Sequence, residues 1–183
     1  MKFLASLILL VLVAVMAMTP ACAQSQSGNA IPHPIVLRLG VDWPNDASVR
    51  TWAGYSPVAA GADYAIGQAG VAGSNISSLY LDYFGGSTNG GHVDVFGFGL
   101  SDRVYAQPAG LNSPTTGQQF FTGGGFGAYS ISSSNGSGVV FGLKAFGGVE
   151  FSQKVIVQLG YNLLPSKNGL NASGFNLQLG LRM

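Results

Sequence analysis

Charged residues are scarce in this sequence. Asp, Glu, Lys and Arg make up 8% of its 183 residues, the formal net charge is +1, and 47% of the residues are hydrophobic. A soluble domain usually carries about 25% charged residues, and disorder needs low hydrophobicity together with high net charge. Nor is there a basic footprint for nucleic acid. The composition therefore excludes a coiled coil, a disordered tail protein and a nucleic-acid-binding domain.

Cysteine is almost absent, and Cys22 lies in a segment that we expect to be removed. Residues 1–23 have the features of a secretory signal peptide: Lys2 supplies the positive charge, residues 7–18 are apolar, and Ala21-Cys22-Ala23 supplies the small residues of a cleavage site. Cleavage after residue 23 would leave an exported chain without disulfides.

Two alternatives to cleavage stay open. Residues 1–23 could be retained as an anchor helix, although the apolar run is short for a membrane span of about 20 residues. Processing as a lipoprotein at Cys22 is the other, although Thr19-Pro20-Ala21 matches a lipobox poorly.

Long apolar runs and good helix formers are lacking after residue 23, and 28 glycines are spread along the chain. The recurring pattern has a period of two, which predicts β-strands. It is cleanest from residue 139 onward, and Gly-, Ser- and Asn-rich turns separate the segments. Eight strands are predicted: residues 37–43, 58–67, 76–85, 92–105, 119–131, 139–151, 155–163 and 175–183.

The two faces of these strands differ in an unusual way. One face is Leu, Val and Phe; the other is Gly, Ala, Ser, Asn and Gln with isolated charges. A soluble sheet would expose Lys, Glu and Thr instead. Small polar side chains suit the interior of a narrow barrel, and a continuous apolar face suits lipid. Because lipid offers the backbone no hydrogen-bond partner, such a sheet must close on itself.

The sequence therefore predicts an all-β fold, an eight-stranded antiparallel up-and-down transmembrane β-barrel. Its domains would be a signal peptide at 1–23, a periplasmic lead-in at 24–34 and the barrel at 35–183. Aromatic residues near the strand ends could form an interfacial girdle or could be ordinary core and loop residues. They are Trp43, Trp52, Tyr83, Phe84 and Tyr129.

Two stretches resemble a known family, the small eight-stranded bacterial outer-membrane barrels of the OmpA, OmpX and opacity-porin type. Residues 142–151, GLKAFGGVEF, with VQLGY at 157–161, are similar to the penultimate hairpin of those proteins. The last strand resembles the signal read by the barrel-assembly machinery, although it ends in Met rather than an aromatic residue. Its outward residues are Phe175, Leu177, Leu179, Leu181 and Met183. A second departure is the long connection at 106–118, where the family has a short periplasmic turn.

Isolated charges on the polar face would point into the barrel. Opposite charges there favour a paired, hydrogen-bonded network, which would plug the lumen. A pore lining or gate is the alternative. The expected lumen network is Arg38, Asp42, Asp63, Asp82, Lys144, Glu150 and Arg182, with Arg103 less clearly placed.

Catalytic and metal-binding patterns are weak. His92 with Asp94 and a serine could form a hydrolase triad, but no spacing fixes such a group and there is no G-x-S-x-G elbow. His33 lies far from His92, so we expect no metal site. The glycine-rich run at 123–127 lacks the lysine and helix of a nucleotide loop. We therefore expect no enzyme and no cofactor.

The resemblance implies a protein of the outer membrane of a diderm bacterium, with membrane lipid as its surroundings. The barrel-assembly machinery and periplasmic chaperones would be its partners during biogenesis. Its role would be structural, or surface interaction through loops near 44–57, 85–91, 132–137 and 165–172. Two alternatives stay open: a secreted soluble β-sandwich that acts as an adhesin or binding module, and a narrow channel for small solutes.

Overall fold

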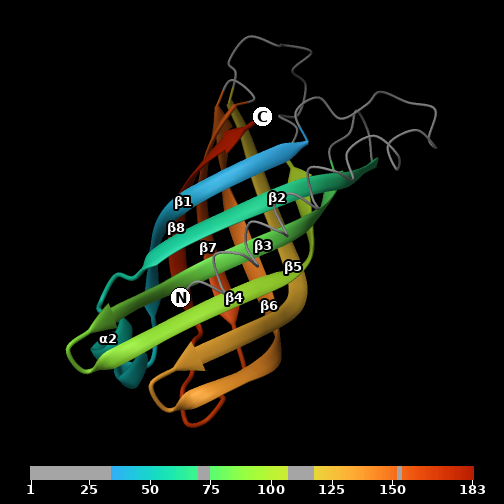
Figure 1. The fold of residues 1–183 in the computed structure, drawn as a ribbon. Helices are drawn as coiled ribbons and strands as arrows, with labels where there is room; N and C mark the ends of the chain where they lie inside the picture. The colour runs from blue at the N-terminus through green and yellow to red at the C-terminus, as the bar shows by residue number, and fades with distance from the viewer. Residues whose placement is uncertain (1–33, 70–74, 107–117, 152–153) are drawn as a thin grey trace. The chain divides into compact units, whose positions relative to one another are not determined.

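The strands of the chain form one sheet that closes into a barrel. The computed structural model describes residues 34–69, 75–106, 118–151 and 154–183, so the expected signal peptide lies outside the described residues. Figure 1 shows the strands wrapping around a common axis with a steep tilt. The elements are β1 (Ile35–Pro44), α2 (Ala47–Ala53), β2 (Val58–Ala69), β3 (Asn75–Thr88), β4 (Gly91–Tyr105), β5 (Gln118–Ser133), β6 (Gly136–Phe151), β7 (Val155–Leu163) and β8 (Gly174–Arg182).

Closure comes from the pairing of the first strand with the last. Each strand pairs antiparallel with its neighbours in sequence, and β1 pairs with β8 from Val36 opposite Arg182 to Pro44 opposite Gly174. The predicted eight-stranded antiparallel barrel is thus confirmed. The soluble β-sandwich is wrong, because the eight described strands make one closed barrel and not two sheets packed face to face.

The period-two pattern has the phase that the sequence predicts. On β8, Leu179 is 62% exposed on the outside, whereas Gln178 is 4% exposed and points inward. The same alternation holds on β7, where Ile156 and Gln158 are buried and Leu159 is exposed. The apolar face is therefore the outer wall, and the glycine-rich polar face lines the interior.

Glycines on the inner face are required by crowding. A methyl group at Gly97 would overlap the ring of Tyr129, which fills the interior across from it. A methyl group at Gly99 would overlap the backbone carbonyl of Phe126 on the neighbouring strand. Gly97 therefore leaves room for a large side chain of the next strand, and Gly99 lets the neighbouring backbone approach closely.

One helix lies in the connection between β1 and β2, where the sequence analysis expects a loop. Asp46 caps its first turn, since its side chain accepts hydrogen bonds from the backbone N–H groups of Ser48 and Val49. Val49 and Ala53, four residues apart, face the same side and are buried. The helix was missed because seven residues give too short a pattern to outweigh the weak helix propensity of the segment. Among the described residues, no helix is long and apolar enough to span a membrane.

Two of the expected surface loops are smaller than predicted. β3 continues to Thr88 and β4 begins at Gly91, so the loop expected at 85–91 is a two-residue turn. The loop expected at 132–137 likewise shrinks to the two residues between β5 and β6. The connections at 107–117 and 152–153 lie outside the described residues, and so does most of the long connection expected at 106–118 between β4 and β5.

Replacing Gly97 with Ala should destabilise the barrel by about 1–3 kcal/mol, because the methyl group forces Tyr129 out of its position. Gly124→Ala is the matched control on the adjacent strand: its methyl group would meet nothing closer than the carbonyl oxygen of Lys144 at 3.4 Å. Urea unfolding in detergent micelles measures both. Equal midpoints for the two variants would contradict the crowding argument.

Candidate functional site: the charged lumen

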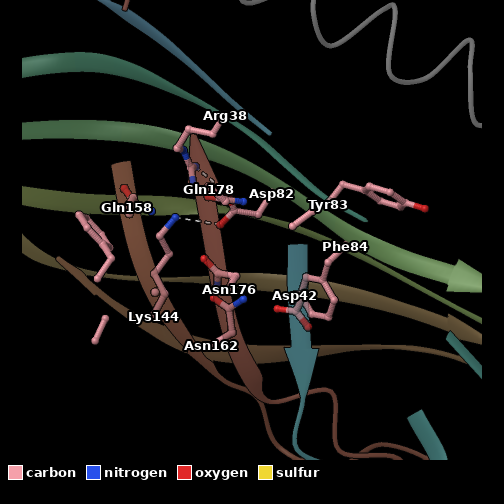
Figure 2. Close-up of a pocket in the computed structure, with 14 residues that line it drawn as sticks. Arg38, Asp42, Asp82, Tyr83, Phe84, Lys144, Gln158, Asn162, Asn176 and Gln178 are labelled. Atoms are coloured by element: carbon pink, nitrogen blue, oxygen red, sulfur yellow. Dashed lines mark hydrogen bonds and ion pairs between the residues drawn. The ribbon is translucent and has the colours of Figure 1, made fainter. Parts of the chain in front are cut away.

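An ion-pair cluster occupies the middle of the barrel. Nη2 of Arg38 lies 2.9 Å from Oδ1 of Asp63 and 2.8 Å from Oδ1 of Asp82, and Nζ of Lys144 lies 2.8 Å from Oδ2 of Asp82. These four side chains, each at most 9% exposed, come from β1, β2, β3 and β6. Figure 2 shows Arg38, Asp82 and Lys144 pointing toward one another across the lumen. We call these four residues, with Arg103, the central cluster.

Further contacts hold the central cluster in place. Nη2 of Arg103 lies 3.4 Å from Oδ2 of Asp63, and Nη1 of Arg38 donates to Oε1 of Gln178. The ammonium group of Lys144 lies 3.8 Å from the ring centroid of Tyr80, a cation–π contact. Buried charges are tolerated when they are paired and hydrogen-bonded in this way.

A second group of polar side chains lies nearer the chain termini. Arg182 contacts Glu150 through two hydrogen bonds, Nε to Oε1 at 2.9 Å and Nη2 to Oε2 at 2.8 Å. The hydroxyl of Tyr105 donates to Glu150 and accepts from Arg182 at 2.7 Å. The expected lumen network is thus divided into this terminal cluster and the central cluster.

Asp42 stands apart from both clusters. It is fully buried, and neither carboxylate oxygen has a hydrogen-bond partner among the described residues. It lines a small cavity together with Asn162 and Asn176, and Figure 2 shows the three side chains in one region. The cavity offers about 10 Å³ to the centre of a water molecule, which is close to the minimum needed to hold one. The ion pairing expected of Asp42 is therefore not found.

The interior toward the β1–β2 and β7–β8 loops is apolar, in contrast to the polar lining that the sequence analysis expects. Val49 and Ala53 of α2 and Leu170 of the β7–β8 loop pack against buried residues of the strands. We call this group the loop-side apolar cluster. Its members are Val49, Ala53, Ala59, Tyr80, Phe84, Val93, Val95, Tyr129, Ile131, Leu164, Leu170 and Ala172.

The predicted aromatic girdle is therefore partly wrong. Trp43 is exposed on the outer wall, and Tyr83 on β3 also lies on the outward face. Phe84 and Tyr129 are buried inside the barrel, and Trp52 packs against the loop-side apolar cluster. The sequence could not separate these cases, because a one-residue change of phase at a strand end exchanges the two faces.

Asp46 ties the two larger loops together. Its Oδ1 accepts from the N–H of Ser48 at 2.7 Å and of Val49 at 3.3 Å, and its Oδ2 accepts from the N–H of Asn171 in the β7–β8 loop at 3.2 Å. Partial burial by itself raises the pKa of Asp46, but these N–H donors hold the pKa below its usual value.

The catalytic group considered around His92 is not assembled in the structure. Nδ1 of His92 lies 3.3 Å from Oγ of Ser134, whereas Asp94 accepts a hydrogen bond from Tyr83, so these side chains do not form the triad that was considered. His33 lies outside the described residues. Within the described parts of the chain, no three His, Cys, Asp or Glu side chains are grouped as a metal would require.

The fold and the lumen define an up-and-down β-barrel with an apolar outer wall and an ion-paired interior. No family model matches the sequence, and no curated protein matches it. The barrel is similar in structure to Neisserial surface protein A, with a TM-score of 0.59 and 12% identity over 81% of this chain and 94% of that one. At this identity the likeness establishes the fold, that of the small eight-stranded barrels.

Two further structures match less closely. The N-terminal β-barrel domain of Pseudomonas aeruginosa OprF gives a TM-score of 0.42 at 12% identity. Ail, the attachment invasion locus protein of Yersinia pestis, determined in complex with the heparin analogue sucrose octasulfate, gives 0.37 at 14% identity. Each match covers 81% of this chain and 96% of the other.

Replacing Arg38 with Ala should lower the free energy of unfolding by about 3–5 kcal/mol, because Asp63 and Asp82 both lose a buried partner. Lys154→Ala, at an exposed position beside the barrel end, is the control and should change it by less than about 0.5 kcal/mol. Denaturant titration followed by tryptophan fluorescence measures both. If Arg38→Ala changed the free energy of unfolding as little as Lys154→Ala, the central cluster would not stabilise the barrel.

Replacing Asp46 with Ala should cost about 0.5–2 kcal/mol, the range for losing a helix cap, whereas Asp46→Asn should retain much of the cap. Because the folded pKa of Asp46 is lowered, its contribution is complete above the ordinary Asp pKa of about 4. It is lost as the pH falls through the folded value. Unfolding midpoints at neutral and acidic pH check this, and an Asp46→Ala effect that grew on acidification would contradict it.

Proposed function

We propose that this chain is an outer-membrane β-barrel with a structural role in the envelope of a diderm bacterium. One observation carries the proposal: large apolar side chains are exposed on the outside of all eight strands, around an interior of buried ion pairs. In water such a wall would be an extreme apolar patch. In lipid it is the expected surface.

The dimensions of the outer wall support a membrane location. On β6 the outward residues run from Val139 to Phe151 without a charge. At about 3.3 Å per residue and a tilt of roughly 45°, this stretch spans about 28 Å along the barrel axis. That is close to the apolar band of about 25 Å that outer-membrane barrels present.

The interior supports a plugged lumen rather than an open channel. The loop-side apolar cluster fills one end, with α2 and the β7–β8 loop packed inward. Paired charges fill the middle, and the terminal cluster lies beyond them. Eight strands enclose an interior that side chains can just fill, and the cavity beside Asp42 has room for about one water.

A structural role is favoured over surface recognition because the loops protrude little. Two of the four loops on the side away from the termini are two-residue turns. The other two, at 45–57 and 164–173, direct Val49 and Leu170 inward, into the loop-side apolar cluster. Few side chains therefore remain to form a specific binding surface.

The course of biogenesis is part of the same proposal. Export would depend on residues 1–23 as a signal peptide. The last strand presents Phe175, Leu177, Leu179, Leu181 and Met183 on its outer face. We expect the barrel-assembly machinery to recognise this continuous apolar face of the last strand. Periplasmic chaperones would keep the unfolded chain soluble before assembly.

Gel mobility and conductance test the proposal. An inserted barrel should fractionate with membranes, run faster before boiling in detergent than after it, and give no steady conductance in planar bilayers. Recovery of folded protein without detergent would refute the membrane location. Steady single-channel currents would refute the plug and favour the channel for small solutes.

A further inference from the structure

Charged side chains are rare on the outer wall. Of the strand residues whose side chains face outward in the described parts of the chain, Asp94 and Asp102 are charged, and both lie on β4. Asp94 is near the loop end and accepts a hydrogen bond from Tyr83 at 2.8 Å. Asp102 lies between outward apolar residues of the same strand, so its position calls for a physical reason.

Apolar side chains surround Asp102 above and below. Along β4 its outward neighbours are Leu100 and Val104, which are 40% and 47% exposed. Phe120 on β5, nearer the end of the barrel that holds the chain termini, is 62% exposed. A carboxylate on the lipid face of a barrel is destabilising unless a partner compensates it.

Other polar residues gather beside Asp102. Ser77 lies opposite it on β3 and donates a hydrogen bond to Oδ1 at 2.5 Å. Thr122 is exposed on β5, and Asn75 lies on β3 opposite Val104. We call Asn75, Ser77, Asp102 and Thr122 the polar notch.

Two glycines lie beside the polar notch on the outer wall. Gly124 lies opposite Asp102 on β5, and Gly147 lies opposite Thr122 on β6. A methyl group at either glycine would meet nothing closer than a backbone oxygen at 3.4 Å. The barrel itself would therefore accept a side chain there, unlike at the crowded glycines of the inner face. Glycine at these two positions leaves the outer wall beside Asp102 and Thr122 without a side chain.

The polar notch supplies hydrogen-bond acceptors and negative charge. Among the described residues, no Lys or Arg forms an ion pair with Asp102. The complementary occupant is a cation that carries N–H donors. A second copy of this chain fits poorly, because a two-fold contact would bring two Asp102 carboxylates together without a cation between them.

The depth of the polar notch identifies the kind of occupant. Val104 is the last outward residue of β4, and Asp102 precedes it by two residues, about 5 Å along the barrel axis at a tilt of roughly 45°. It therefore lies close to the edge of the apolar band on the side of the chain termini, within reach of a lipid headgroup. A cation at this level that has N–H donors is a primary ammonium headgroup.

We propose that the polar notch binds the ammonium headgroup of one phospholipid of the phosphatidylethanolamine class, with the headgroup seated over Gly124 against Asp102. The proposal rests on the membrane location given above. It predicts selectivity against phosphatidylcholine, whose quaternary ammonium carries the same charge but has no N–H donor.

Native mass spectrometry tests the predicted lipid preference. The folded barrel is released from micelles that contain equal amounts of phosphatidylethanolamine and phosphatidylcholine, and the lipid that stays bound is identified. The wild type should retain phosphatidylethanolamine in preference by at least about fivefold, the scale of one charge-assisted hydrogen bond. Asp102→Asn and Asp102→Leu should abolish the preference. Gly124→Leu, which keeps the carboxylate but places a bulky apolar side chain beside it, should also weaken it.

Asp94→Asn is the matched control, since it removes the other outward carboxylate of the same strand and should keep the preference. The boiling-dependent gel shift verifies that each variant is folded, and Gly124→Ala replaces Gly124→Leu if the larger side chain prevents folding. Equal retention of the two lipids by folded wild type would overturn this proposal and leave the membrane location intact. A dimer that disappears in Asp102→Asn would overturn it in favour of self-association.

Discussion

Everything in this molecule depends on the hydrogen bonds that join β1 to β8. An open sheet would leave two strand edges with unpaired backbone groups, and each such group costs several kcal/mol in an apolar medium. Pairing from Val36–Arg182 to Pro44–Gly174 removes both edges. Once the sheet is closed, each side chain has either an inner or an outer position, and the two populations meet entirely different surroundings.

The inner population must fit a narrow space and satisfy its own polar groups. Glycines such as Gly97 make room for the large side chains of other strands. The central cluster pairs Arg38 and Lys144 with two aspartates, and the terminal cluster pairs Arg182 with Glu150. At the loop end the solution is different, because α2 and the β7–β8 loop fold inward as an apolar core. The interior thus combines a soluble-protein core with a polar network.

The outward side chains follow a simpler rule, since they are apolar, and a departure from this rule is informative. Side chains on the outside are apolar along nearly the whole wall, as on β6 and β8. At the polar notch, Asp102, its hydrogen-bonded neighbour Ser77 and the nearby Gly124 replace that surface with acceptors and a position that lacks a side chain. A carboxylate on a lipid-facing wall is energetically unfavourable unless a partner compensates its charge. A bound ammonium headgroup would supply that partner for Asp102.

Much of this arrangement was determined by the sequence alone. Strict alternation, as from Phe175 to Met183, specifies the strands, their faces and therefore the closed barrel, because the side chains of a strand repeat with a period of two. The inward charges Arg38, Asp82 and Lys144 could also be placed from that phase. Their partners could not: Lys144 and Asp82 are 62 residues apart, and closure of the barrel brings them together while it leaves Asp42 without a partner. The same holds for α2, whose burial of Val49 depends on a surface that β3, β4 and β5 create later in the chain.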